Sequence, residues 1–105
     1  PCVKPNVEHA WHLYPLRLKL RRWTIDRDQF IEELAKRNIG ASVHFIPLHE
    51  MTFYRDRYNL SDKDFPVAAE EAPRLVSIPL NANMSRSDAL DVIDAVQDIQ
   101  KHFGQ

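Results

Sequence analysis

Residues 24–46, TIDRDQFIEELAKRNIGASVHFI, predict a helix followed by a short strand. Asp26 can cap the first turn, and Gln29 stands three residues later, where its side chain can reciprocate. Apolar side chains then recur at helical spacing, with charged side chains between them. Residues 38–40 supply Asn and Gly, which tolerate the left-handed conformation that ends many helices. The next segment, 41–46, is rich in β-branched and aromatic residues, so we expect a strand there.

Two further strands are predicted at some distance on either side of this helix. Residues 12–20 alternate between apolar and polar side chains, which is typical of a half-buried strand. Pro15 places that strand at an edge of its sheet or makes its start irregular. Residues 75–80, LVSIPL, predict another strand, and Pro79 again indicates an edge or a strand end.

Three more helices complete the predicted elements. Residues 51–58 and 65–72 are expected to form short helices, with a polar loop between them. Ser85 and Asp88 have the spacing of a capping box and predict the start of a longer helix. Its apolar side chains then recur at helical spacing to the end of the chain. They are Ala89, Val92, Ile93, Val96, Ile99 and Phe103.

This order of elements predicts an α+β fold, with a small antiparallel sheet of about three strands and helices packed on one face. Residues 1–10 carry two prolines without periodicity and predict an incoming linker, so the domain is expected over residues 11–105. Because the chain begins with Pro1 rather than with methionine, we expect it to be a piece of a longer protein.

Composition limits the classes of function. The chain has 105 residues, and its 44% hydrophobic content suits one globular domain. Lys and Arg number 14 against 15 Asp and Glu, so no charge excess favours nucleic acid or an anionic membrane as a partner. A single cysteine, Cys2, cannot form an internal disulfide, and no apolar run approaches a membrane span. We therefore expect a cytoplasmic protein.

The five histidines raise the question of a metal site. His9 and His12 lie three residues apart, but they fall where a linker enters a strand. His44 and His49 are separated by Pro47, and neither a second cysteine nor a paired carboxylate completes a ligand set. We therefore expect no metal. The chain also lacks a nucleophile in a strained turn, and two glycines are too few for a phosphate-binding loop.

Residues 40–58 leave two interpretations open. In the first, they form a capped strand end whose aromatic side chains pack in the core, which is the more typical environment for Phe53. In the second, Pro47 turns the chain so that polar and aromatic side chains face another domain or subunit. Imidazole and guanidinium groups there would suit an anionic or hydroxyl-rich ligand. The side chains concerned are His44, His49, Tyr54 and Arg55.

Four segments together resemble the C-terminal portion of a known family. They are HAWHLYPLRL (9–18), RDQFIEELAKRNIGASVHFIPLH (27–49), FYRDRY (53–58) and DFPVAAEEAPRLVSIPLNANMS (64–85). In order and spacing they resemble the DegT/DnrJ/StrS family of pyridoxal-phosphate-dependent sugar-nucleotide aminotransferases, from about His9 to the end. Pro73 and the turn NANMS depart from the usual pattern of the family.

This resemblance implies the small domain of a fold-type I aminotransferase, whose missing large domain binds pyridoxal 5'-phosphate. The intact enzyme would transfer an amino group from glutamate to a keto-sugar nucleotide, in cell-surface polysaccharide or natural-product sugar biosynthesis, and would be a homodimer. The chain alone is expected to be inactive, because none of its lysines lies in a segment that matches the one bearing the Schiff base. The alternative is a free-standing ligand-sensing or protein-interaction module without catalysis.

The resemblance also implies where the substrate would lie. We expect His44, His49 and Tyr54 to be substrate-side residues that act by hydrogen bonding and positioning, and we expect no catalytic, cofactor-binding or metal-binding residue in this chain. Arg74 is expected to pair with Glu70 or Glu71. A domain taken from a larger enzyme should also expose an apolar patch. Candidates for that patch are Trp11, Phe45, Met51 and Phe53.

Overall fold

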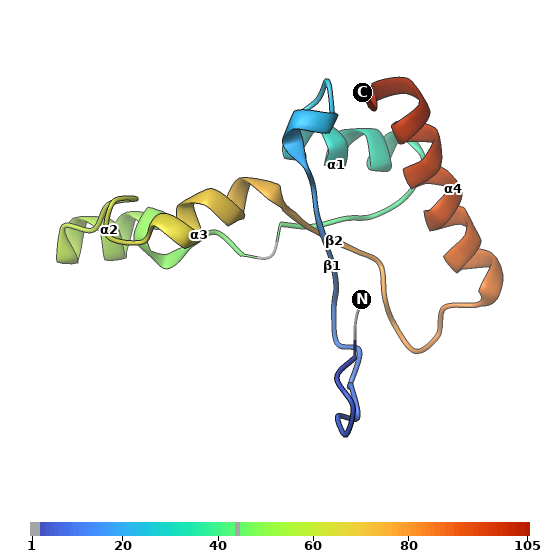
Figure 1. The fold of residues 1–105 in the computed structure, drawn as a ribbon, viewed down its shortest axis with the longest axis horizontal. Coiled ribbons are helices and arrows are strands. Elements are labelled where there is room, and N and C mark those ends of the chain that lie inside the picture. Colours follow the sequence, from blue (N-terminus) through green and yellow to red (C-terminus); the bar gives the residue numbers. More distant parts are fainter. Residues whose placement is uncertain (1–2, 44) are drawn as a thin grey trace.

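The computed structural model describes residues 3–43 and 45–105. Two parts are visible in Figure 1: a body, in which two strands lie against α1 and α4, and an arm that carries α2 and α3 away from it. The radius of gyration is 16.1 Å, whereas a compact chain of this length would have about 13 Å. The elements are β1 (Tyr14–Arg17), η1 (Leu20–Arg22), α1 (Arg27–Lys36), η2 (Leu48–Glu50), α2 (Thr52–Tyr58), α3 (Pro66–Glu71), η3 (Ala72–Arg74), β2 (Leu75–Ile78) and α4 (Arg86–Phe103).

The sheet is antiparallel, and its two named strands are β1 and β2, with Leu16 opposite Val76. Residues 41–46 were expected to add a third strand, but among the described residues only Ser42 pairs, through an isolated bridge to Ser77. The two backbone hydrogen bonds of this bridge measure 3.0 and 2.8 Å. Toward residue 40 the pairing stops at this bridge, because Pro79 has no N–H to donate to the neighbouring strand.

The core lies where α1 and α4 cover one face of the sheet, as predicted. Phe30 and Leu34 of α1, Val76 of β2 and Ile99 of α4 are almost completely buried. On β1, Leu16 packs against this cluster while its neighbours in sequence, Pro15 and Arg17, are exposed. The alternation predicted for this strand is therefore confirmed.

Both predicted capping boxes are present. The Asp26 carboxylate accepts a hydrogen bond from the Gln29 backbone N–H (2.8 Å), and the Gln29 side chain accepts one from the Asp26 N–H (3.0 Å). Ser85 and Asp88 make the same reciprocal pair at the start of α4. After α1, Asn38 has a φ of 59°, so it takes the left-handed conformation that its side chain tolerates.

The buried stripe of α4 agrees with most of the prediction. Val92 and Ile99 are buried, and Val96 and Phe103 are partly buried. Ala89 and Ile93 are exposed, Ile93 to 48%, and Ala95 is buried although it was not predicted to be. Ile93 lies about 100° around the helix from Val92, beyond the contact with α1 and the sheet, so its assignment to the core is wrong.

No helix of the described residues, α4 included, is long and apolar enough to cross a membrane.

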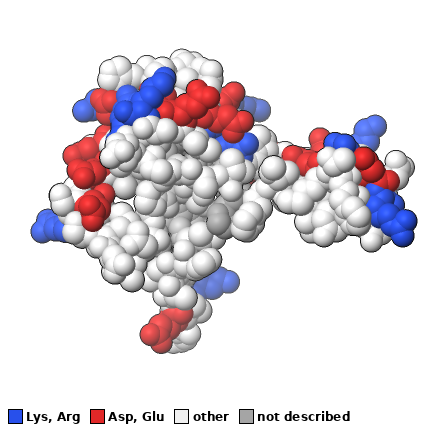
Figure 2. Space-filling view, turned by 180° about the vertical axis from the view of Figure 1, so that it is seen from behind, with Lys and Arg blue, Asp and Glu red and all other residues white. Residues whose placement is uncertain are grey.

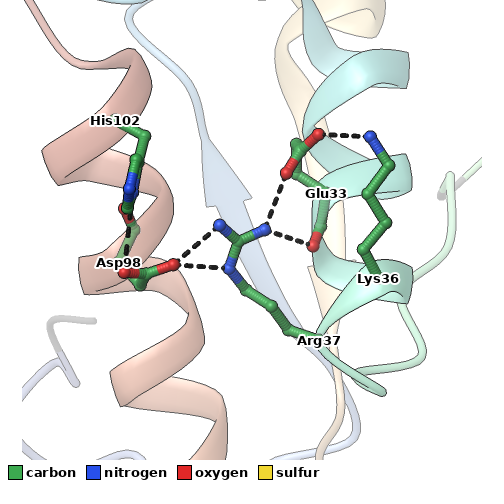
Figure 3. Close-up of polar contacts among 5 residues, drawn as sticks. All are labelled: Glu33, Lys36, Arg37, Asp98 and His102. Carbon is green, nitrogen blue, oxygen red and sulfur yellow. Dashed lines mark hydrogen bonds and ion pairs between the residues drawn. The ribbon is translucent and has the colours of Figure 1, made fainter.

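A charged network joins α1 to α4 (Figure 3). Arg37 donates from Nε and Nη2 to the Asp98 carboxylate at 2.8 and 2.7 Å, and from Nη1 to Glu33 at 2.7 Å. Glu33 also accepts from Lys36 at 2.6 Å, and His102 Nδ1 lies 2.8 Å from the backbone oxygen of Asp98. The pairs along α1 follow from its sequence spacing, whereas the bridge to Asp98 depends on how the two helices pack.

This network makes stability depend on pH. Hydrogen bonding to Arg37 lowers the pKa of Asp98, and hydrogen bonds from Lys36 and then Arg37 lower the pKa of Glu33. Depressed carboxyl pKa values stabilise the fold above the ordinary range of about 4 and stop doing so as the pH falls through them. We predict that the melting temperature falls below pH 4, and that Asp98→Asn lowers it at pH 7 and flattens the acid loss. Asp94→Asn, on the exposed side of α4, is the control. Identical profiles for Asp98→Asn and the wild type would contradict this role.

Candidate functional site

The arm, defined here as residues 45–71, contains η2, α2 and α3 and supplies none of the buried hydrophobic side chains of the core. Its helices contact chiefly their neighbours in sequence, α2 against η2 and α3 against η3. Figure 2 shows the arm as a separate lobe with uncharged side chains over much of the side in view. Of the substrate-side residues predicted from the sequence, His49 and Tyr54 lie on this lobe, which is therefore the candidate site.

Arg74, just after the arm, fixes the base of the arm to the body. Its Nη1 lies 3.0 Å from Glu71 and 3.4 Å from Glu70, which confirms the predicted pairing. Its Nε donates to the backbone oxygen of Leu18 (3.3 Å), and its own carbonyl accepts from the Leu18 N–H (2.8 Å). Arg17 on β1 also pairs with Glu71. The end of α3 is therefore tied to the β1 edge of the body.

His49 is the buried centre of the arm, with only 4% of its surface exposed. Its ring stacks on that of Phe65, with 4.9 Å between centroids and 20° between planes. Its Nε2 lies 3.4 Å from Asp62 Oδ1 and 3.9 Å from Glu50 Oε1, but it makes no hydrogen bond within the described residues. Proteins rarely leave a buried polar atom in this state, so this nitrogen is a candidate functional group.

Residues 61–65 form a tight turn that holds two of these partners in place. The Asp64 carboxylate accepts hydrogen bonds from the Ser61 N–H (2.9 Å) and hydroxyl (2.8 Å), and these bonds lower the pKa of Asp64. The Asp64 N–H donates to Ser61 (3.0 Å), and the Phe65 N–H donates to Asp62 (3.2 Å). The turn thereby sets Asp62 and Phe65 at fixed positions beside His49.

The aromatic side chains of α2 point outward. Phe53 is 69% exposed and Tyr54 is 38% exposed, and their rings meet edge to face at 5.3 Å. The interpretation of Phe53 as a core residue is therefore wrong, and the structure favours a contact surface. Trp11, Phe45 and Phe53 are exposed as expected, whereas Met51 is partly buried. Exposed apolar side chains of the arm are Phe45, Ile46, Leu48, Phe53, Tyr58, Phe65 and Val67.

The three predicted substrate-side residues fall in different environments. His44 lies outside the described residues, His49 is buried, and Tyr54 is exposed on α2. Asp62 and Phe65, which complete the surroundings of His49, were missed. Phe65 belongs to the FP segment of the family pattern and could have been noticed. Asp62 stands in a polar loop with no sequence signal that separates it from a solvated carboxylate.

The lysines of the chain do not fit a pyridoxal site by themselves. A Schiff-base lysine needs an environment that favours its neutral amine, together with groups that hold the cofactor ring and phosphate. All five lysines are exposed, so none has the burial that such a site requires. They are Lys4, Lys19, Lys36, Lys63 and Lys101.

Comparison with known proteins identifies the family. Residues 2–97 match the model of the DegT/DnrJ/EryC1/StrS aminotransferase family, and the chain belongs to it. It is 48% identical over 99 residues to the uncharacterized protein MJ1066 of Methanocaldococcus jannaschii, and 41% identical over 102 residues to the spore coat polysaccharide biosynthesis protein SpsC of Bacillus subtilis. These alignments cover 94% and 96% of the chain, but only 26% of each relative.

Solved structures show the same fold within much larger chains. PseC of Helicobacter pylori, an aminotransferase involved in the biosynthesis of pseudoaminic acid, aligns with a TM-score of 0.76 and 26% identity. That alignment covers 88% of this chain and 24% of PseC. The apo form of the sugar aminotransferase Spr1654 of Streptococcus pneumoniae shares the fold, with a TM-score of 0.75 at 24% identity over 87% of this chain and 22% of its own. The α+β small-domain class is thereby confirmed.

A pair of matched substitutions tests whether the arm presents a contact surface. We predict that Phe53→Ala changes the free energy of unfolding by no more than about 1 kcal/mol, since only an exposed ring contact is lost. Phe30→Ala should cost about 3–5 kcal/mol, because it empties a buried site in the body. Urea unfolding followed by circular dichroism measures both. An equal cost for the two variants would restore the core interpretation of Phe53.

Proposed function

We propose that residues 11–105 are the C-terminal small domain of a pyridoxal-phosphate-dependent aminotransferase and that residues 1–10 link it to a larger cofactor domain. The complete enzyme would transfer an amino group from glutamate to a keto-sugar nucleotide, in cell-surface polysaccharide or natural-product sugar biosynthesis. The family match over residues 2–97 carries this proposal. The names of SpsC and PseC, with their links to polysaccharide and pseudoaminic acid biosynthesis, support it.

In this proposal the chain contributes shape and contacts, and the chemistry of amino transfer comes from the cofactor on the other domain. Its exposed lysines are consistent with that division. The apolar side chains of the arm would pack against the cofactor-bearing part of the enzyme and keep water out of the substrate cleft. We include a homodimeric enzyme in the proposal. A single cysteine agrees with a cytoplasmic setting.

The arm residues would then have different roles in substrate binding. Tyr54 offers a partly exposed hydroxyl that can hydrogen-bond a hydroxyl-rich or anionic ligand. His49 is buried under Phe65, so we assign it a positioning role that sets the surface of η2 and the turn at 61–65. His44 stays in the proposal as a substrate-side residue on the strength of the family resemblance alone.

The proposed reaction can be assayed directly. The full-length protein that carries this chain, supplied with pyridoxal phosphate, glutamate and a nucleotide-linked keto-sugar, should release 2-oxoglutarate and form the amino sugar. The 105-residue chain alone should show no turnover. Turnover by the isolated chain, or a full-length protein without transaminase activity on any keto-sugar nucleotide, would overturn the proposal.

The role of Tyr54 can be measured in the same assay. Tyr54→Phe in the full-length protein should raise KM for the nucleotide sugar by about tenfold, the equivalent of one lost hydrogen bond of about 1.4 kcal/mol, and leave KM for glutamate unchanged. Tyr14→Phe, on β1 and outside the arm, is the control. Equal kinetics for Tyr54→Phe and the wild type would remove Tyr54 from the substrate site.

A further inference from the structure

We propose that His49, Glu50 and Asp62 bind a divalent transition-metal ion inside the arm. Zn²⁺ is the ion that we expect there. Each side chain can offer one ligand atom, and the three atoms lie within 4.8 Å of one another. From the sequence we expected no metal, because neither a second cysteine nor a paired carboxylate completed a ligand set around the histidines. Folding supplies the missing carboxylate, since the turn at 61–65 brings Asp62 to the ring of His49.

The spacing of the ligand atoms suits a tetrahedral ion. Ligands about 2.1 Å from a tetrahedral Zn²⁺ are separated from one another by about 3.4 Å. His49 Nε2 lies 3.4 Å from Asp62 Oδ1 and 3.9 Å from Glu50 Oε1. A direct hydrogen bond from the ring would be shorter, usually 2.7–3.2 Å. The separation of His49 Nε2 from Asp62 Oδ1 therefore equals the tetrahedral value, Glu50 Oε1 lies 0.5 Å further from Nε2, and all three atoms lie within 4.8 Å of one another.

The state of His49 is an independent indication of a ligand. Only 4% of its side chain is exposed, and Nε2 makes no hydrogen bond within the described residues although it lies 3.4 and 3.9 Å from the two carboxylates. A bound cation would satisfy this nitrogen, because neutral imidazole offers a lone pair to a metal. Stacking on Phe65 restricts the plane of the ring and so keeps Nε2 on the side of Asp62 and Glu50.

The two carboxylates give the ion a route from solvent and match its charge. The Asp62 and Glu50 side chains are 75% and 42% exposed, so an ion can approach from their side and keep water as a fourth ligand. Two carboxylates carry a charge of −2, which a divalent ion neutralises. Imidazole among the ligands favours Zn²⁺ or Co²⁺ over Mg²⁺ and Ca²⁺, which take oxygen ligands.

Cobalt provides the test, since tetrahedral Co²⁺ is coloured and Zn²⁺ displaces it. We expect titration of the 105-residue chain with Co²⁺ to give a tetrahedral visible spectrum that saturates at one ion and disappears on adding Zn²⁺. Asp62→Asn and Glu50→Gln should each weaken binding by at least about tenfold. Both positions are exposed, so both variants should keep the circular dichroism spectrum of the wild type. Asp56→Asn on α2 and His102→Gln on α4 are the matched controls and should bind as the wild type does.

Three results would overturn the proposal. They are the absence of a tetrahedral spectrum, a spectrum that persists at full strength in Asp62→Asn, and an equal loss in the control variants. The outcome is independent of the proposed amino transfer, because the metal is measured on the isolated chain without cofactor or substrate.

Discussion

Burial of Phe30, Leu34, Val76 and Ile99 in one cluster is the constraint on which the rest of the structure depends. These four side chains come from α1, β2 and α4, so their contact joins three distant segments of the chain and covers one face of the sheet. The apolar area removed from water there supplies the main favourable term in folding. Because no buried hydrophobic residue of this core comes from the arm, the body can close while the arm stays outside.

The exposed arm therefore has its own means of staying ordered. Arg74 ties its base to the β1 edge of the body, and the stack of His49 on Phe65 gives it a small centre. Its outward side chains include Phe53 and Leu48, which a free-standing domain would gain by covering. The chain belongs to an aminotransferase family, and its relatives MJ1066 and SpsC are about four times as long as the chain. The proposed function assigns this surface to the contact with the remainder of such an enzyme.

Most of the fold could be predicted, because helix starts and apolar periodicity depend on residues close together in the sequence. Features that depend on packing between distant segments could not be predicted. The capping boxes at Asp26 and Ser85 depend only on neighbours in sequence, and both are present. The segment 41–46 has strand-like composition, but its pairing depends on β2, where Pro79 lacks an N–H, and among its described residues only Ser42 forms a bridge. Within the site, the turn that follows α2 brings Asp62 to His49. No periodicity in the sequence predicts that these two side chains lie close together.

The body is expected to fold without the arm, and hydrogen exchange of the 105-residue chain tests this most directly. Amides of α1, α4 and β2 should exchange only through global opening, because their hydrogen bonds surround the buried cluster. Amides of α2 and α3 should exchange much faster, through openings that leave the body intact. The same slow exchange in all of these elements would contradict the account, because it would mean that the arm and the body share one cooperative core.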